Sequence, residues 1–202
     1  MRSALEQFTS AELRALLKLK SPRGIQQFLD EIPYHHAGTA WSPRLVLRER
    51  TAHCLEGAVF AAAALRAIGY PPLVFDLEGY RDDDHVLAVF QQNNHWGAIA
   101  KSNFSGLRYR APVYRTMREL ALSYFENYFN LAGDRSLRRY STKPVDLSRF
   151  DKLNWMTTEK NIWFISDHLC DVPHTRLLTA KMERELTRID KRSLGAGKFG
   201  RQ

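Results

Sequence analysis

The sequence predicts an α+β fold, and three observations support this assignment. Residues 52–68 combine high helix propensity with almost no charge, which is typical of a buried helix. The chain then changes to short apolar stretches at 73–77, 85–90 and 95–100, which are typical of β-strands. Apolar residues at helical spacing recur on both sides of this segment. We therefore expect a central helix, a small antiparallel sheet and additional surrounding helices.

Length and composition are consistent with one ordinary globular domain. The chain has 202 residues, of which 44% are hydrophobic and 26% charged, so it is long enough to bury a full core. No repeat or linker divides it. We expect residues 1–190 to form a single domain. The glycine-rich, basic residues 191–202 are expected to be a flexible tail.

The residues before the central helix contain two helix starts. Thr9 and Glu12 have the spacing of a capping box, and Ser21 followed by Pro22 has the pattern of a cap and a first helical residue. The second helix ends at Pro33, and residues 34–43 are expected to form a loop that holds His35, His36 and Trp41.

The C-terminal half is predicted to consist of helices that support the sheet. Helical spacing or a cap residue predicts helices over 115–129, from Thr158 through Ile165, and over 179–189. We expect these helices to pack around the sheet and to shape one wall of a cleft.

Cys54 lies in the first turn predicted for the central helix. Gly69 is the expected end of that helix, and Pro71 and Pro72 prevent its continuation. At a helix start, unpaired backbone N–H groups and the helix dipole favour a thiolate and lower the pKa of a thiol. Cys54 is therefore a candidate nucleophile.

His85 is the candidate partner of Cys54. It begins an apolar strand directly after the polar loop Arg81–Asp84, where a side chain can face a cleft while its backbone is held rigidly. The turn between the second and third strands is short, which implies an antiparallel hairpin.

Three segments in this order resemble the transglutaminase-like family of the papain-like superfamily, and more narrowly a bacterial branch of it. They are HCLEGAVFAAAALRAIGYPP, DDDHVLAVF and HWGAIAKSNF, within about residues 42–110. The resemblance implies a nucleophile-bearing helix packed on an antiparallel sheet, with a Cys–His–Asp triad for acyl transfer or amide hydrolysis. It assigns Cys54 as the nucleophile and His85 as the base.

The third triad position departs from the family pattern. The family places an Asp four residues after the strand's Trp, but here Ala100 follows Trp96 at that distance. No carboxylate lies between Asp84 and Arg110. The group that orients the imidazole must then be neutral, as the Asn is in papain-like proteases, unless an acid reaches it from elsewhere.

Three residues remain open for that position. A two-residue hairpin loop sets Ser102 opposite His85, whereas a three-residue loop sets Asn103 opposite it. Asn103 is preferred because its amide oxygen can accept a hydrogen bond from the imidazole N–H directly, whereas the hydroxyl group of a serine must first rotate into a suitable orientation. Asp76, on the preceding strand, is the third candidate. Ser102 and Trp41 are also candidate substrate-binding residues.

Other reactive side chains are assigned structural roles. Cys170 is interpreted as a core residue, and Glu56 would raise the thiol pKa if its carboxylate pointed toward Cys54. His168 and His174 flank Pro173 without a zinc-like spacing. We expect no metal and no cofactor.

The charge balance and the two cysteines limit the possible binding partners and the cellular compartment. The net charge is +8, but the basic residues are scattered and form no dense run, so we do not expect nucleic acid as a partner. No apolar run has the length of a membrane span, and the first residues lack a signal-peptide pattern. Two cysteines suit a reducing compartment, and we expect a cytoplasmic protein.

Two functions from different classes follow. The first is a cysteine-dependent hydrolase or acyltransferase that acts on an amide, peptide or ester through Cys54 and His85. The second is a binding module that keeps the fold without a competent triad, and the missing Asp favours it. The sequence leaves open the substrate, the choice between hydrolysis and transfer, and the oligomeric state.

Overall fold

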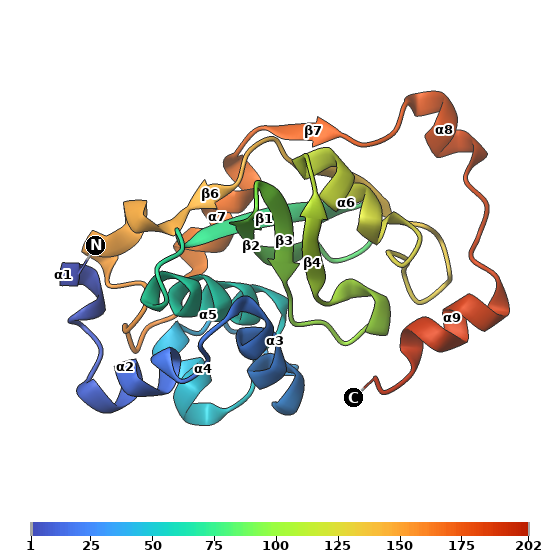
Figure 1. Ribbon diagram of the computed structural model, residues 1–202. Helices are drawn as coiled ribbons and strands as arrows, with labels where there is room; N and C mark the ends of the chain where they lie inside the picture. The colour runs from blue at the N-terminus through green and yellow to red at the C-terminus, as the bar shows by residue number, and fades with distance from the viewer. Residues whose placement is uncertain (1, 202) are drawn as a thin grey trace.

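A computed structural model describes residues 2–201 and shows an α+β fold, as the sequence predicts (Figure 1). Met1 and Gln202, the outer ends of the two predicted ranges, lie outside the described residues. The helices are α1 (Arg2–Leu5), α2 (Ser10–Leu17), α3 (Pro22–Glu31), α4 (Pro43–Glu49), α5 (Cys54–Ala67), α6 (Met117–Phe125), α7 (Trp163–Asp171), α8 (Ala180–Glu185), α9 (Lys191–Lys198) and the short 3₁₀ helices η1 (Ser105–Leu107) and η2 (Leu147–Leu153).

The strands form one antiparallel sheet in the order β4-β3-β2-β1-β5-β7, with β6 paired to β1. They are β1 (Leu73–Gly79), β2 (His85–Gln92), β3 (His95–Ile99), β4 (Arg110–Tyr114), β5 (Leu137–Ser141), β6 (Val145–Asp146) and β7 (His174–Arg176). The sheet is larger than the three strands that the sequence predicts.

The β2–β3 hairpin has the two-residue loop. Gln92 pairs with His95, so Asn93 and Asn94 form the turn, with φ of 51° and 60°. Two successive positive φ values are those of a type I′ turn, which asparagine tolerates and which matches the twist of the strands. Regular pairing ends at Ala88 and Ile99, before it reaches His85 and Ser102.

Helix α5 packs on one face of the sheet and is buried from Leu55 to Arg66. Its four consecutive alanines, at 61–64, lie in the same cluster as Val74, Val86 and Ala88. The opposite face of the sheet packs against α6 and forms a second cluster that includes Phe75, Leu77, Leu87, Val89 and Tyr124. Figure 1 shows α2, α3 and α4 gathered beside α5, so this helix is enclosed on all sides.

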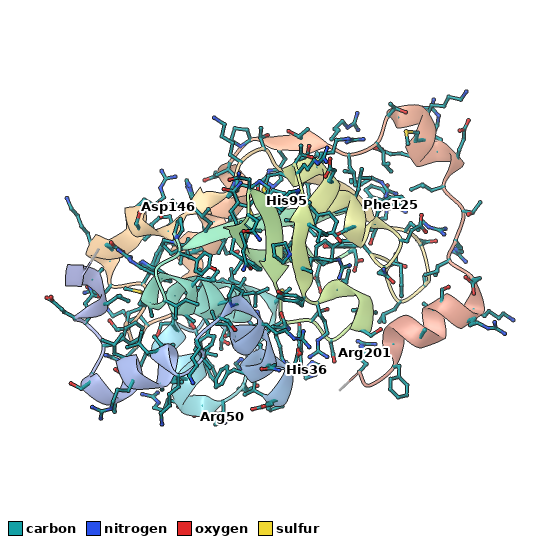
Figure 2. The ribbon with its side chains drawn as sticks, viewed as in Figure 1. His36, Arg50, His95, Phe125, Asp146 and Arg201 are labelled. Atoms are coloured by element: carbon teal, nitrogen blue, oxygen red, sulfur yellow. The ribbon has the colours of Figure 1, made fainter. Side chains whose placement is uncertain are left out.

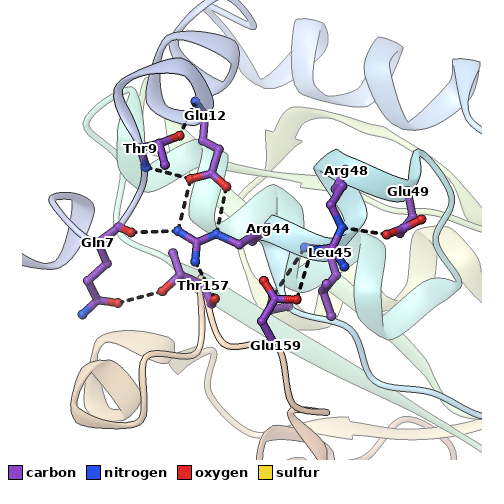
Figure 3. A network of polar contacts seen from close by, with 10 residues as sticks. Gln7, Thr9, Glu12, Arg44, Leu45, Arg48, Glu49, Thr157 and Glu159 are labelled. Atoms are coloured by element: carbon purple, nitrogen blue, oxygen red, sulfur yellow. Dashed lines mark hydrogen bonds and ion pairs between the residues drawn. The ribbon is translucent and has the colours of Figure 1, made fainter.

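Arg44 of α4 holds the N-terminal helices to a distant loop (Figure 3). Its guanidinium donates to both oxygens of Glu12, at 2.8 and 3.1 Å, and to the carbonyl groups of Gln7 and Thr157. Glu12 also closes the capping box with Thr9, as the sequence predicts. This network fixes α4, and with it the chain that leads into α5.

Several elements differ from the prediction. Helix α4 has Ser42 as cap and Pro43 as first residue, so it begins at the end of the predicted 34–43 loop and continues to Glu49, where no helix is predicted. Helix α7 starts at Trp163, so Thr158 does not cap it, and α6 and α8 are shorter than predicted. A helix, α9, capped by Asp190, occupies most of the expected tail. No helix among residues 2–201 is long and apolar enough to cross a membrane.

Candidate functional site

Cys54 is the first residue of α5 and is half-buried at the edge of a cavity. Its Sγ lies 3.9 Å from the carbonyl oxygen of Asp84, to which the thiol donates. The main-chain N–H groups of Leu55 and Val86 are directed at the sulfur. The helix start and the start of strand β2 therefore meet at this atom.

The thiol of Cys54 is neutral in this environment. Burial raises its pKa to about 11. The main-chain N–H groups of Val86 and Leu55 favour the thiolate and lower the pKa, but by less than burial raises it. The charges of Asp83 and Asp76 raise the pKa further. The lowered pKa expected from the helix start is therefore wrong for this structure, because burial and two acids outweigh the helix effect.

His85 is buried at the first position of β2, and its Nε2 lies 2.8 Å from the carbonyl oxygen of Leu107. Because a carbonyl only accepts, Nε2 carries the proton and Nδ1 keeps its lone pair. Burial lowers the pKa of His85 to about 4, and the charge of Arg110 acts in the same direction. The hydrogen bond to Leu107 raises the pKa but does not offset burial. The imidazole is neutral at pH 7.

The pleat of β1 and β2 places His85 and Asp76 on opposite faces. His85 pairs with Leu77, and Asp76 pairs with Val86 on the side of α5. The carboxylate of Asp76 lies 2.9 Å from Nε2 of His174 instead. Asp76 therefore does not orient His85, and the Leu107 carbonyl does so in this structure.

One cavity of about 190 Å³ brings together four of the sequence-predicted residues: Cys54, His85, Ser102 and Asn103. Ser102 donates no strand hydrogen bond to β2, and its hydroxyl accepts from the N–H of Phe104 at 3.0 Å. His36 and Arg201, from distant parts of the chain, are exposed side chains of the same cavity (Figure 2). Other lining residues are Tyr34, Asp82–Asp84, Phe104, Leu107, Tyr128 and Phe129.

Trp41 does not line the cavity. Its ring centre lies 4.1 Å from that of His35, and its main-chain N–H donates to Glu56 at 3.0 Å. Trp41 therefore belongs to the wall that supports the start of α5, and the structure gives it no place at Cys54.

Tyr34 is a site residue that the sequence did not indicate. Its hydroxyl oxygen accepts from the main-chain N–H of Cys54 and also contacts the thiol. Burial, with the charge of a Cys54 thiolate, raises the pKa of Tyr34, so the hydroxyl keeps its proton. A parallel bridge between Tyr34 and Ala52 holds the residue in place, and no sequence pattern marks such a long-range contact.

Glu56 points away from the thiol and into the loop before α4. Its carboxylate accepts from the hydroxyl of Thr39 at 2.7 Å and from the main-chain N–H groups of Trp41 and His53 at 3.0 and 3.1 Å. It also contacts His35 Nδ1 at 2.9 Å. Burial raises its pKa, but these histidines and hydrogen bonds outweigh burial and leave the pKa lowered. Glu56 is a buried support of the site.

Cys170 is exposed, so its assignment to the core is wrong. It lies at the end of α7, beside Asp76 and His174, whose Nδ1 donates to the carbonyl of Val172 at 2.8 Å. Both nitrogens of His174 are therefore occupied, and it offers no base to Cys170. No three His, Cys, Asp or Glu side chains of residues 2–201 are arranged to hold a metal ion.

Comparison of the chain with protein-family models gives no match, and comparison with curated proteins gives none either.

Proposed function

We propose that this protein is a cysteine-dependent hydrolase or acyltransferase that uses Cys54 as nucleophile and His85 as base. The observation that carries the proposal is one cavity in which a helix-start thiol, a neutral imidazole and hydrogen-bond donors converge. The substrate class is an amide, peptide or ester. A transglutaminase-like ancestry, bacterial origin and a cytoplasmic location belong to the same proposal.

The reaction starts from a neutral pair, because the thiol pKa lies far above that of the imidazole. Proton transfer from sulfur to Nδ1 of His85 therefore accompanies the attack of sulfur on the substrate carbonyl carbon. The C–S bond forms as the carbonyl π bond opens onto oxygen. The Leu107 carbonyl stabilises the imidazolium and holds its ring, the role that a carboxamide has in papain-like proteases.

The oxyanion needs donors beside the sulfur. The Tyr34 hydroxyl is the first donor that we assign to it, and the Cys54 N–H is the second once the substrate oxygen replaces the Tyr34 oxygen as its acceptor. The imidazolium then returns its proton to the leaving amine or alcohol as the C–N or C–O bond breaks. Water or a second amine attacks the thioester and regenerates the thiol.

A specific observation supports the second candidate, a binding module without turnover. The charges that act on the Cys54 thiol are those of acids, Asp83 and Asp76, and not that of an imidazolium. Such an environment keeps the thiol protonated and unreactive. In this case the same cavity binds a ligand and releases it unchanged.

Acylation by p-nitrophenyl acetate separates the two functions. We expect a burst of p-nitrophenolate and an acetyl group on Cys54, both lost in Cys54→Ser and kept in the control Cys170→Ser. His85→Gln should slow acylation about 10²–10⁴-fold by removing the base, and Tyr34→Phe about 10²-fold by removing an oxyanion donor. Equal slow acetylation of Cys54 and Cys170 would leave the binding module as the function.

A further inference from the structure

A second cavity, of about 270 Å³, shares no lining residue with the cavity at Cys54. It lies between residues 80–81, residues 130–138 and the chain from Glu183 to Arg188. Four arginines line it: Arg81, Arg135, Arg138 and Arg188. The lining contains two acids, Asp134 and Glu183, so the cavity has an excess of positive charge.

Two of the four arginines form no ion pair with an acid among residues 2–201, although the charge of Arg81 also acts on Asp134. Arg188 pairs with Asp134 at 2.7 Å, and Arg135 pairs with Glu126, outside the cavity. The ion pairs of the described residues include neither Arg81 nor Arg138. These two guanidinium groups are therefore available to an anion.

Arg138 and Arg81 converge on one aromatic ring. Their guanidinium carbons lie 5.4 and 5.1 Å from the ring centre of Tyr80, which is 52% exposed. Nη1 of Arg138 also donates to the carbonyls of Arg135 and Leu137, at 2.9 and 3.0 Å. The Arg138 fork is thus held in place while its Nε and Nη2 donate to no described residue. A fixed planar fork suits a phosphate, to which it donates two parallel hydrogen bonds.

Glu183 indicates what the ligand carries besides an anion. Its carboxylate lines the cavity, accepts no hydrogen bond from any described residue, and forms an ion pair at 3.7 Å with Arg176, which is not a lining residue. A carboxylate that lacks a hydrogen-bond donor can accept a hydrogen bond from a hydroxyl group of a ligand through its exposed part.

We propose that this cavity binds a small phosphate ester with free hydroxyl groups, of the sugar phosphate class. Its phosphate contacts Arg81 and Arg138, and one hydroxyl donates to Glu183. The cavity is small enough to select a single phosphorylated molecule rather than a polymer.

Titration calorimetry of the full chain with glucose 6-phosphate, inorganic phosphate and glucose tests the proposal. We expect saturable binding of glucose 6-phosphate and none of glucose. Arg138→Gln and Arg81→Gln should each weaken binding about tenfold, the loss of one charge-assisted contact. The matched control is Arg139→Gln, the next residue of β5, whose guanidinium pairs with Glu78 outside the cavity. It should change the affinity less than about twofold.

Glu183→Gln separates the ester from free phosphate. It should weaken glucose 6-phosphate more than inorganic phosphate, because only the ester donates to residue 183. Equal affinity for the two anions in the native chain would overturn the hydroxyl contact. No saturable binding up to about 10 mM, or equal losses in the Arg138 and Arg139 variants, would overturn the site, provided that circular dichroism shows each variant folded.

Discussion

The thiol of Cys54 receives two opposing influences. Its position at the start of α5 favours the thiolate, and burial favours the neutral thiol. Burial is the larger effect and, with Asp83 and Asp76, brings the pKa to about 11. The sequence shows the helix start. It does not show the two acids, because their distance from the sulfur depends on how β1 and its loop pack beside α5.

Alkylation by iodoacetamide measures this balance directly. With a resting pKa of about 11, the thiolate fraction of Cys54 rises about tenfold per pH unit from pH 7 to pH 10. We expect the alkylation rate of Cys54 in Cys170→Ser to rise with the same slope, measured by mass spectrometry. Cys170 in Cys54→Ser should react at least as fast at pH 8, because it is exposed. A Cys54 rate that is constant from about pH 6 to pH 8 would show a preformed thiolate and contradict the prediction.

The residues around His85 mark the limit of sequence-based prediction of this site. Its position at a strand start is correctly predicted, because a polar loop and an apolar run bound it. Its hydrogen-bond partner is a main-chain carbonyl, that of Leu107, and any residue type could supply it. The face of the sheet on which His85 lies could not be predicted either. Strand β2 is buried on both sides from Val86 to Phe90, so polar and apolar residues do not alternate along it.

At the scale of elements, Glu56 ties the Tyr34–Trp41 loop to the start of α5. Glu56→Ala removes the acceptor of Thr39, Trp41 and His53 and leaves their donors unsatisfied. We expect a loss of about 3 kcal/mol in the free energy of unfolding, typical of breaking a buried charged network. Urea denaturation at pH 7 measures this loss.

The matched control for that prediction is Glu49→Ala. Glu49 is a carboxylate of the neighbouring helix α4 and forms an exposed ion pair with Arg48. Removing it should cost less than about 1 kcal/mol. Equal losses in the two variants would show that the Glu56 network contributes no more than a surface pair.

The elements that the sequence predicts are those with local signals. The capping box of α2, the Ser21–Pro22 start of α3 and the Gly69 end of α5 are all formed, the last with φ of 97°. Two other elements contain residues that argue against them in the sequence.

Strand β4 contains Pro112, which is tolerated because this strand is at the edge of the sheet. Helix α9 contains Gly195 and Gly197, and in the sequence these two glycines suggest a frayed tail.

Packing explains the glycine at one of these positions. A Cβ at residue 197 would lie 2.3 Å from the ring of Phe129, so α9 approaches that ring closely only with glycine there. Ser105 of η1 also donates to the carbonyl of Ala196 at 2.8 Å. The segment that looks like a tail in the sequence therefore packs beside the Cys54 cavity, through contacts that are distant along the chain.

At the scale of the whole molecule, the sheet separates two clusters of buried residues, and the candidate site lies where they meet. Cys54 approaches from the face that α5 covers, and His85 is on the face that α6 covers. The two can share one cavity because each is the terminal residue of its element. The fold class followed from the sequence, whereas this meeting point depends on the register of β1 with β2.

Burial of His85 makes the stability of the whole chain depend on pH. Its pKa is lowered from 6.5 to about 4 in the folded state, so the unfolded state binds more protons between these values. The contribution of His85 to stability is complete above about pH 6.5. It is lost as the pH falls toward 4, and the difference in pKa corresponds to about 3 kcal/mol.

Comparison with His85→Phe isolates this contribution from the carboxylates that titrate in the same range. The variant lacks the hydrogen bond to Leu107, which changes its stability by an amount that does not depend on pH. We expect the difference in unfolding free energy between the native chain and His85→Phe, from urea denaturation, to shift by up to about 3 kcal/mol between pH 6.5 and 4. The native chain should lose stability relative to His85→Phe as the pH falls. If the difference between the native chain and His85→Phe stays constant, His85 titrates alike in both states. The neutral buried imidazole, and with it the proton acceptor assigned to Cys54, would then be wrong.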